Sequence, residues 1–168
     1  MRFPRTLSLL SLTVFAILLT SLAHADFTDG VSGYLRGDYE TASKEWLPLA
    51  KAGNREAQFQ LGGLYADGQG VPQDYAQSRE WYRKAAAQGH ALAQNNLGVM
   101  YHLGQGVQQD FAEAARWVRK AAEQGHVKAQ PMLGFMYGKG QDVPQDYVQA
   151  SMWYNLAAVP GERNGCKE

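Results

Sequence analysis

The sequence predicts an all-α protein, a solenoid of stacked helix pairs, and three observations support this. The segment GQGVPQDYAQSREWYRKAA at residues 68–86 returns 36 residues later as GQGVQQDFAEAARWVRKAA at residues 104–122. Within each unit, apolar residues recur at the spacing of one helix face. Eight positions recur in three successive units: Ala57, Ala93 and Ala129; Leu61, Leu97 and Leu133; Gly62, Gly98 and Gly134; Tyr65, Tyr101 and Tyr137; Gly68, Gly104 and Gly140; Val71, Val107 and Val143; Asp74, Asp110 and Asp146; Trp81, Trp117 and Trp153. A period of this length indicates units that bury their apolar faces only by stacking on one another.

Each unit begins with a helix whose inward face is apolar. In the first full unit Ala57, Leu61 and Tyr65 lie four residues apart, on one stripe of a helix. Gly62 interrupts that helix, where glycine costs about 1 kcal/mol relative to alanine. Its recurrence predicts a place where the second helix packs closely against the first. Gly68 follows the last periodic residue and suits the left-handed position after a helix end.

A recurring aspartate marks the start of the second helix. Asp74 and Gln77 have the spacing of a capping box, in which the aspartate accepts from free amides and its partner reaches back to the aspartate's own N–H. We interpret these aspartates as caps; catalytic carboxylates are the alternative. Gly89 and Gly125 are expected to close the second helices. The inward stripe of the first full unit comprises Tyr75, Ser78, Trp81, Tyr82, Ala85 and Ala86, with Arg79, Arg83 and Lys84 facing solvent.

The period also divides the chain. Residues 26–53 are expected to form an atypical partial repeat, in which Trp46 takes the place of Tyr82, and residues 54–161 form three full repeats of 36 residues. Asp142 replaces a loop glycine in the third repeat, Val159-Pro160 stops its second helix, and residues 162–168 form a frayed tail. Trp117 has a repeat on either side, so we expect it to be deeply packed and its loss to cost more than that of Trp153.

The first 25 residues predict an export signal rather than part of the fold. Arg2 and Arg5 precede an apolar run from Leu7 to Leu22, and Ala23-His24-Ala25 supplies the small residues that a signal peptidase accepts. We expect cleavage after Ala25; a retained membrane anchor is the alternative. No cysteine lies near this site for lipid attachment, and nothing later in the chain is apolar enough to span a bilayer.

The composition of the mature chain excludes some partners. Without Arg2 and Arg5, 14 basic residues stand against 16 acidic ones, a net charge of −2 that does not indicate nucleic-acid binding. Cys166 is the one cysteine, so no internal disulfide can form. It is expected to be an exposed thiol, with an intermolecular disulfide as the alternative.

The unit resembles the Sel-one-like repeat, a relative of the tetratricopeptide repeat, through the pattern A-x-x-x-L-G-x-x-Y-x-x-G-x-G-V-x-x-D-x-x-x-A-x-x-W-x-x-x-A-A-x-x-G. Residues 57–161 match it in three units and residues 33–53 match it in part. The resemblance implies antiparallel helix pairs stacked into a right-handed superhelix, with the first helix of each pair lining a concave face. It also implies an adaptor for other proteins, and exported bacterial members are common. Some exported relatives carry a disulfide in each repeat and are linked to penicillin binding or weak β-lactam hydrolysis, but this chain lacks those cysteines.

The same resemblance locates a candidate binding face. Since recurring positions serve packing, recognition is expected where the units differ in side chain. Apolar anchors beside an amide would suit a peptide or a partner helix, and a merely solvated groove is the alternative. His102 has no counterpart in the other units and is expected to contact a partner. The candidate protein-binding residues are Glu56, Phe59, Gly63, Asp67, Asn95, Val99, His102, Lys128, Phe135 and Lys139, together with Ala66, Leu92, Leu103, Pro131 and Gly138.

The sequence offers little support for catalysis, metal binding or a cofactor. His90 and His126 recur with the period after helix-ending glycines, and we interpret them as polar groups at the start of a helix, with metal ligands as the alternative. The GQG loops lack the Lys-Ser/Thr of a phosphate loop. No serine, histidine and acid are spaced as a catalytic triad. We therefore expect no enzyme, no metal and no cofactor.

Together these features predict an exported adaptor, periplasmic or secreted from a bacterium, that binds another protein or peptide through its concave face. An enzyme or ligand binder acting on cell-wall material or β-lactams is the alternative. A structural part of an envelope assembly is a further one.

Overall fold

The computed structural model describes residues 27–140 and 143–158, in which helices alternate with short turns and loops and no strand occurs. Residues 27–35 form a helical segment at the N-terminal end. The helices that follow are α2 (Tyr39–Lys51), α3 (Arg55–Asp67), α4 (Tyr75–Ala87), α5 (Ala91–Leu103), α6 (Phe111–Glu123), α7 (Ala129–Lys139) and α8 (Tyr147–Ala158).

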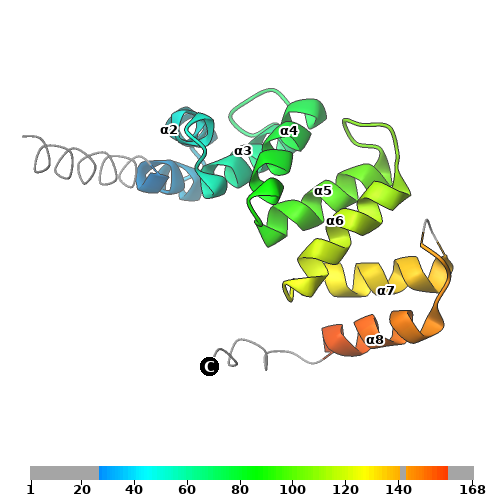
Figure 1. The fold of residues 1–168 in the computed structure, drawn as a ribbon. Helices are drawn as coiled ribbons and strands as arrows, with labels where there is room; N and C mark the ends of the chain where they lie inside the picture. Colours follow the sequence, from blue (N-terminus) through cyan, green and yellow to red (C-terminus); the bar gives the residue numbers. More distant parts are fainter. Residues whose placement is uncertain (1–26, 141–142, 159–168) are drawn as a thin grey trace, which may run out of the picture.

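Helices that are consecutive in the chain pack side by side. The pairs α3 with α4, α5 with α6 and α7 with α8 each form one repeat, and contacts of α4 with α5 and of α6 with α7 join one repeat to the next. Figure 1 shows the result as a row of helices that steps from α2 at one end to α8 at the other. The predicted all-α solenoid of stacked helix pairs is confirmed.

The second helices α4, α6 and α8 begin at the recurring aspartates. The Asp74 carboxylate accepts hydrogen bonds from the Ala76 and Gln77 N–H groups at 2.8 and 3.0 Å. The carboxylates of Asp110 and Asp146 accept from backbone N–H groups at the starts of α6 and α8 in the same way, at 2.9 to 3.0 Å. These aspartates are helix caps, as predicted.

The reciprocal half of the predicted capping box is wrong. The N–H of Asp74 donates instead to the carbonyl oxygen of Tyr65 in the first helix, at 2.9 Å. Asp110 and Tyr101 form the equivalent bond at 3.0 Å, as do Asp146 and Tyr137. Because the first helix already supplies an acceptor, the side chain three residues after the aspartate has no N–H to reach back to, and the bond ties the two helices of each repeat together.

The recurring glycine inside the first helix marks the closest approach within a repeat. A Cβ atom on Gly62 would lie 2.5 Å from the Tyr82 ring, and one on Gly98 would lie 2.6 Å from a Val118 methyl group. Both distances are shorter than side chains tolerate, so the close packing predicted from these glycines is confirmed. Gly68 has φ of 68°, the left-handed conformation expected after the helix end.

The core of each repeat centres on the shared leucine. Leu61, Leu97 and Leu133 have no exposed surface. Most of the predicted inward stripe of α4 is buried as well, namely Ser78, Trp81, Tyr82, Ala85 and Ala86. Tyr75, at the start of the stripe, is half-buried. The apolar positions of the period therefore form the core, which consists of three successive clusters along the solenoid.

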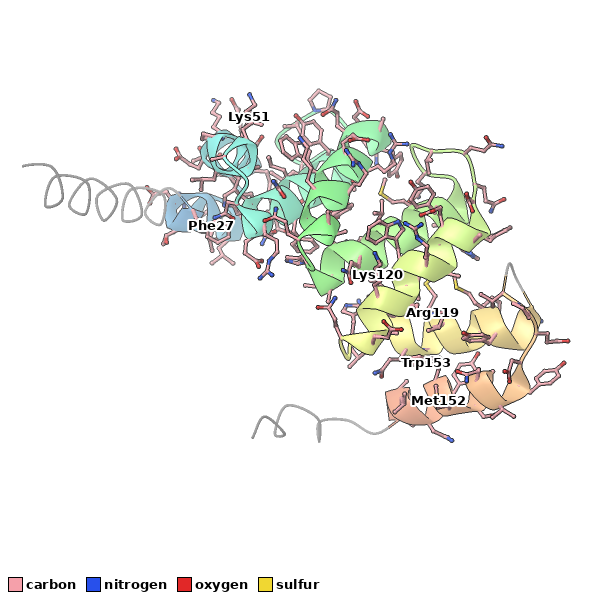
Figure 2. All side chains as sticks on the ribbon, in the orientation of Figure 1. Phe27, Lys51, Arg119, Lys120, Met152 and Trp153 are labelled. Carbon is pink, nitrogen blue, oxygen red and sulfur yellow. The ribbon has the colours of Figure 1, made fainter. Side chains whose placement is uncertain are left out.

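The recurring tryptophans are less uniform. Trp81 is 6 % exposed, but Trp117 and Trp153 are half-buried. The expectation that Trp117 is deeply packed is wrong: its ring lies at the rim of the core, where the Lys120 ammonium group covers it at 4.5 Å from the ring centre. Trp153 packs from α8 onto the core beside α7, whereas Met152 next to it is exposed (Figure 2).

Several expectations concern residues outside the described ranges. These are the signal peptide at residues 1–25, the substituted glycine position at Asp142, the helix end at Val159-Pro160, and the tail with Cys166. Among the helices of the described residues, none combines the length and the apolar character needed to cross a bilayer.

Candidate functional site

The candidate binding residues lie on α3, α5 and α7, the first helix of each repeat, except for Lys128, which is the N-cap residue of α7. We call this surface the first-helix face and define it by those residues. The structure brings some of them together around repeat boundaries and leaves others exposed or covered. The first boundary is that between α4 and α5, and the second boundary is that between α6 and α7.

Glu56 and Phe59 of α3 meet His90, which starts α5. The Phe59 and His90 rings stack with their centres 4.4 Å apart, and His90 Nε2 lies 3.0 Å from a Glu56 carboxylate oxygen. The other ring nitrogen, Nδ1, accepts a hydrogen bond from the Ala93 N–H at 3.2 Å. His90 therefore caps α5, as predicted for a polar group at a helix start, and in addition fixes one end of the face.

The period places Asn54, His90 and His126 at the same position of successive units. Asn54 accepts from the Ala57 N–H at 2.9 Å, and His126 Nδ1 accepts from the Ala129 N–H at 3.2 Å. Burial lowers the pKa of His126, and the nearby Lys128 ammonium lowers it further. Since Nδ1 must be unprotonated to accept, a lowered pKa supports the capping role.

Val99 of α5 and Ala66 of α3 line a pocket of about 140 Å³ between the first two repeats. Buried Tyr82 and Met100 form part of its lining. Burial raises the pKa of the Tyr82 hydroxyl, and the Asp67 carboxylate raises it further, while a hydrogen bond with Asn96 opposes them. Two predicted residues of the first-helix face, Ala66 and Val99, are thus brought together at a concave feature. Gly63 lies beside it, where an added Cβ would be 3.7 Å from the Tyr82 hydroxyl.

Asn95 and His102 present less surface than their positions suggested. Asn95 is only 7 % exposed, and its Oδ1 is buried without a hydrogen-bond partner among the described residues. Its Nδ2 donates a long bond to Asn96 Oδ1 at 3.5 Å. The half-buried His102 ring packs edge-on against Phe111 of α6, with ring centres 5.1 Å apart.

The third repeat carries the most exposed anchor of the face. Phe135 on α7 is 43 % exposed, and the Lys139 ammonium lies 6.0 Å from its ring centre. Lys128 at the start of α7 and Asp67 at the end of α3 are exposed too. Among these four residues, the contact found within the described ranges is that of Lys139 with Phe135.

Sequence reasoning missed two sets of glutamines that hold the face in place. The Gln58 and Gln94 amides donate to the carbonyl oxygens of Ala50 and Ala86 in the preceding repeat, at 3.0 and 3.1 Å. A second set donates to carbonyl oxygens near the end of the first helix: Gln73 to Ala66 at 2.7 Å, Gln109 to His102 at 2.6 Å and Gln145 to Gly138 at 2.9 Å. Both sets recur every 36 residues, so alignment of the repeats with one another could have identified them.

The residues with possible catalytic or metal-binding chemistry have structural partners. The Ser78 hydroxyl donates to the Gly62 carbonyl oxygen at 2.7 Å and has no exposed surface. Within the described parts of the chain, no three residues of the histidine, cysteine, aspartate or glutamate type are grouped to hold a metal ion.

Comparison with known proteins agrees with this architecture. The family model described as Sel1 repeat matches residues 55–90, 91–126 and 127–158. The chain therefore belongs to the Sel1 repeat family, a fold that commonly mediates protein–protein interaction. The match covers the three helix pairs from α3 to α8.

Two solved structures are similar to this chain. A Sel1 repeat protein from Oxalobacter formigenes is 39 % identical with a TM-score of 0.74, over 77 % of this chain and 53 % of that one. A protective antigen with an SLR fold, present in uropathogenic Escherichia coli strains, is 44 % identical with a TM-score of 0.76, over 81 % of this chain and 30 % of that one. The chain thus spans about half of the first protein and less than a third of the second. No curated protein matches.

Proposed function

We propose that this chain is an exported adaptor that binds another protein or peptide through its first-helix face and acts by binding rather than by catalysis. Membership of a family whose fold commonly mediates protein–protein interaction supports the general role. The finer assignment to one face rests on the side chains that vary from repeat to repeat.

The observation that carries this proposal is the contrast between the core and the first-helix face. The leucine and glycine positions are the same in all three repeats. At one position of the face, however, the chain carries in turn Gly63 and Val99, which are half-buried, and Phe135, which is exposed. Phe135 is a large exposed aromatic residue with an ammonium group beside it, the type of residue that anchors many protein interfaces.

Export is the second part of the proposal. The basic start, the apolar run and the Ala23-His24-Ala25 sequence support a cleaved signal peptide, which would place the mature chain in the periplasm or outside the cell. The similar protein from uropathogenic Escherichia coli is a protective antigen, which is compatible with such a location. The mass of the chain isolated after expression in a bacterium tests this, since cleavage after Ala25 leaves Asp26 as the first residue.

Affinity capture from a bacterial envelope extract tests the binding face. The bait is the mature chain, compared with a Phe135→Ser, Lys139→Ala double variant. We expect the captured proteins to be lost from this variant because both changes remove the exposed anchor and leave the buried core untouched.

A double variant on other surfaces is the matched control. Val148→Ser changes an exposed valine on α8 and Lys51→Ala changes an exposed lysine at the end of α2, so the same residue classes are altered away from the face. Equal capture by both double variants, with unchanged circular dichroism, would contradict the assignment of the face.

A further inference from the structure

The pocket at the first boundary is a defined cavity on the first-helix face. Ala66 and Val99 form its walls, while Asn96 and Gln105 add amide groups to a lining that is otherwise largely apolar. A cavity of similar size in another protein holds a benzene-sized group, and a water molecule occupies only about 30 Å³ of liquid. Drug-sized ligands need roughly 300 Å³ or more. At about 140 Å³, this pocket suits one side chain.

The walls of the pocket are held before any ligand arrives. Gly106 has φ of 66°, and a Cβ atom there would overlap the backbone of Tyr75, so the loop behind Gln105 sits directly against the start of α4. The Gln73 amide lies within hydrogen-bond distance of both the Ala66 carbonyl oxygen, at 2.7 Å, and the Tyr75 hydroxyl, at 3.2 Å. A preformed cavity loses little conformational entropy when it is filled.

At the other boundaries the equivalent space is filled, either by larger residues at these positions or by a neighbouring ring. At the second boundary, His102 and Phe135 replace Ala66 and Val99, and the His102 ring packs against an aromatic ring of α6. At the N-terminal end, Gly30 occupies the position of Ala66, and the Trp46 indole takes up the space beside it. The pocket therefore opens at the first boundary because Ala66 and Val99 are small and Tyr82 stands where the N-terminal end has the larger Trp46.

The electrostatic potential beside the pocket is negative and favours a basic residue in a bound segment. Asp67 follows Ala66, is exposed, and lies close enough that its charge acts on the Tyr82 hydroxyl in the pocket. Both residues belong to the last turn of α3, where the helix dipole adds negative potential.

We propose that this pocket binds one aliphatic side chain of a partner peptide segment, and that a lysine or arginine next to it in the segment pairs with Asp67. This rests on the proposed binding function and adds the chemistry of the bound segment. The Asn96 and Gln105 amides are placed to hydrogen-bond the backbone of the same segment.

Selection of a random-peptide phage library on the immobilised mature chain tests the proposal. The enriched peptides are expected to share a leucine, isoleucine, valine or methionine adjacent to a basic residue. A synthetic peptide of the consensus should lose affinity by about tenfold or more when its aliphatic residue is replaced by alanine, because burial of that side chain is lost. Ala66→Leu, which fills the pocket from within, should cause a similar loss, and Asp67→Asn should weaken binding and reduce its salt dependence.

Ala87→Leu is the matched control, since it adds the same atoms at an exposed alanine at the end of α4. This variant should bind the peptide as the unchanged chain does. Unaltered affinity of Ala66→Leu, a consensus without an aliphatic residue, or no enrichment at all would each overturn the proposal. Capture of envelope proteins that depends on Phe135 and Lys139 but persists in Ala66→Leu would leave the adaptor function standing and refute only the pocket.

Discussion

The two repeat boundaries share one backbone plan but differ in how their side chains are packed. At the first boundary Trp117 of α6 is half-buried at the rim of the core, and His90 is held on two sides, by the Phe59 ring and the Glu56 carboxylate. At the second boundary Trp153 of α8 takes the equivalent half-buried place, and the positions that correspond to Phe59 and Glu56 carry other residues.

Those corresponding residues are Asn95 and Leu92, so the histidine of the second boundary has neither an aromatic nor a carboxylate at the matching positions. The hydrogen bond of the histidine is kept, since His126 still accepts from the Ala129 N–H, although α7 begins only at Ala129 with Lys128 as its N-cap residue. The difference shows that the period fixes caps and core leucines, whereas the stability and chemistry of each boundary depend on residues that vary.

Replacement of Trp81 and of Trp117 by alanine should show the largest difference between two parts of the solenoid. Trp81 packs in the core of α2 and α3, whereas Trp117 lies at the rim of the core at the first boundary. Trp81→Ala removes an almost fully buried indole and should lower the free energy of unfolding by about 3–5 kcal/mol. Trp117→Ala should lower it by roughly 1–3 kcal/mol, because part of that ring is already in solvent. Urea unfolding followed by far-UV circular dichroism measures both.

The matched exposed change Tyr147→Ala on α8 should leave the unfolding midpoint nearly unaltered. Equal losses for Trp81→Ala and Trp117→Ala would mean that the difference in burial between these two tryptophans has no energetic consequence. Since repeat proteins can unfold in parts, a changed slope in urea would identify a variant that uncouples its boundary.

Much of the fold could be predicted because the recurring residues have roles that depend only on their local sequence. An aspartate before an apolar run caps a helix whatever its surroundings, and Asp74 does so. A glycine kept inside a helix despite its cost indicates close packing, and Gly62 meets the Tyr82 ring as expected. Leu61 lies on the inward stripe of its helix and is fully buried.

The remaining features depend on distances that a linear pattern does not contain. The Asp74 N–H finds the Tyr65 carbonyl oxygen only because two helices pack side by side, so the reciprocal capping bond could not be judged from spacing. The exposure of Trp117 depends on which side chains border it in space. The pocket beside Ala66 and Val99 arises from small residues on two different helices, a combination visible only after the helices are stacked.

The histidine position offers a smaller and sharper test of the comparison. His90→Asn should keep the cap of α5, as Asn54 does for α3, but lose the Phe59 stack and the Glu56 contact. His90→Ala should lose the cap as well and cost about 1 kcal/mol more. At the second boundary, His126→Asn should lower the free energy of unfolding by less than His90→Asn does, measured by the same urea unfolding. The opposite order would show that the ring contacts of His90 do not stabilise the first boundary.

The smallest expected effect is a pH dependence at the second boundary. Burial and the Lys128 charge lower the pKa of His126 in the folded chain below the usual value of about 6.5. The unfolded chain then binds more protons at this residue than the folded chain, so its contribution to stability is present above about pH 6.5 and is lost as the pH falls through the folded pKa. Because solvent partly screens His126, the effect should stay below about 1 kcal/mol. His126→Asn keeps a capping oxygen without a titrating group, and its urea midpoint should fall less than that of the unchanged chain between neutral and mildly acidic pH. An equal fall of the urea midpoint with pH in the two proteins would mean that the folded environment does not disfavour the histidine charge.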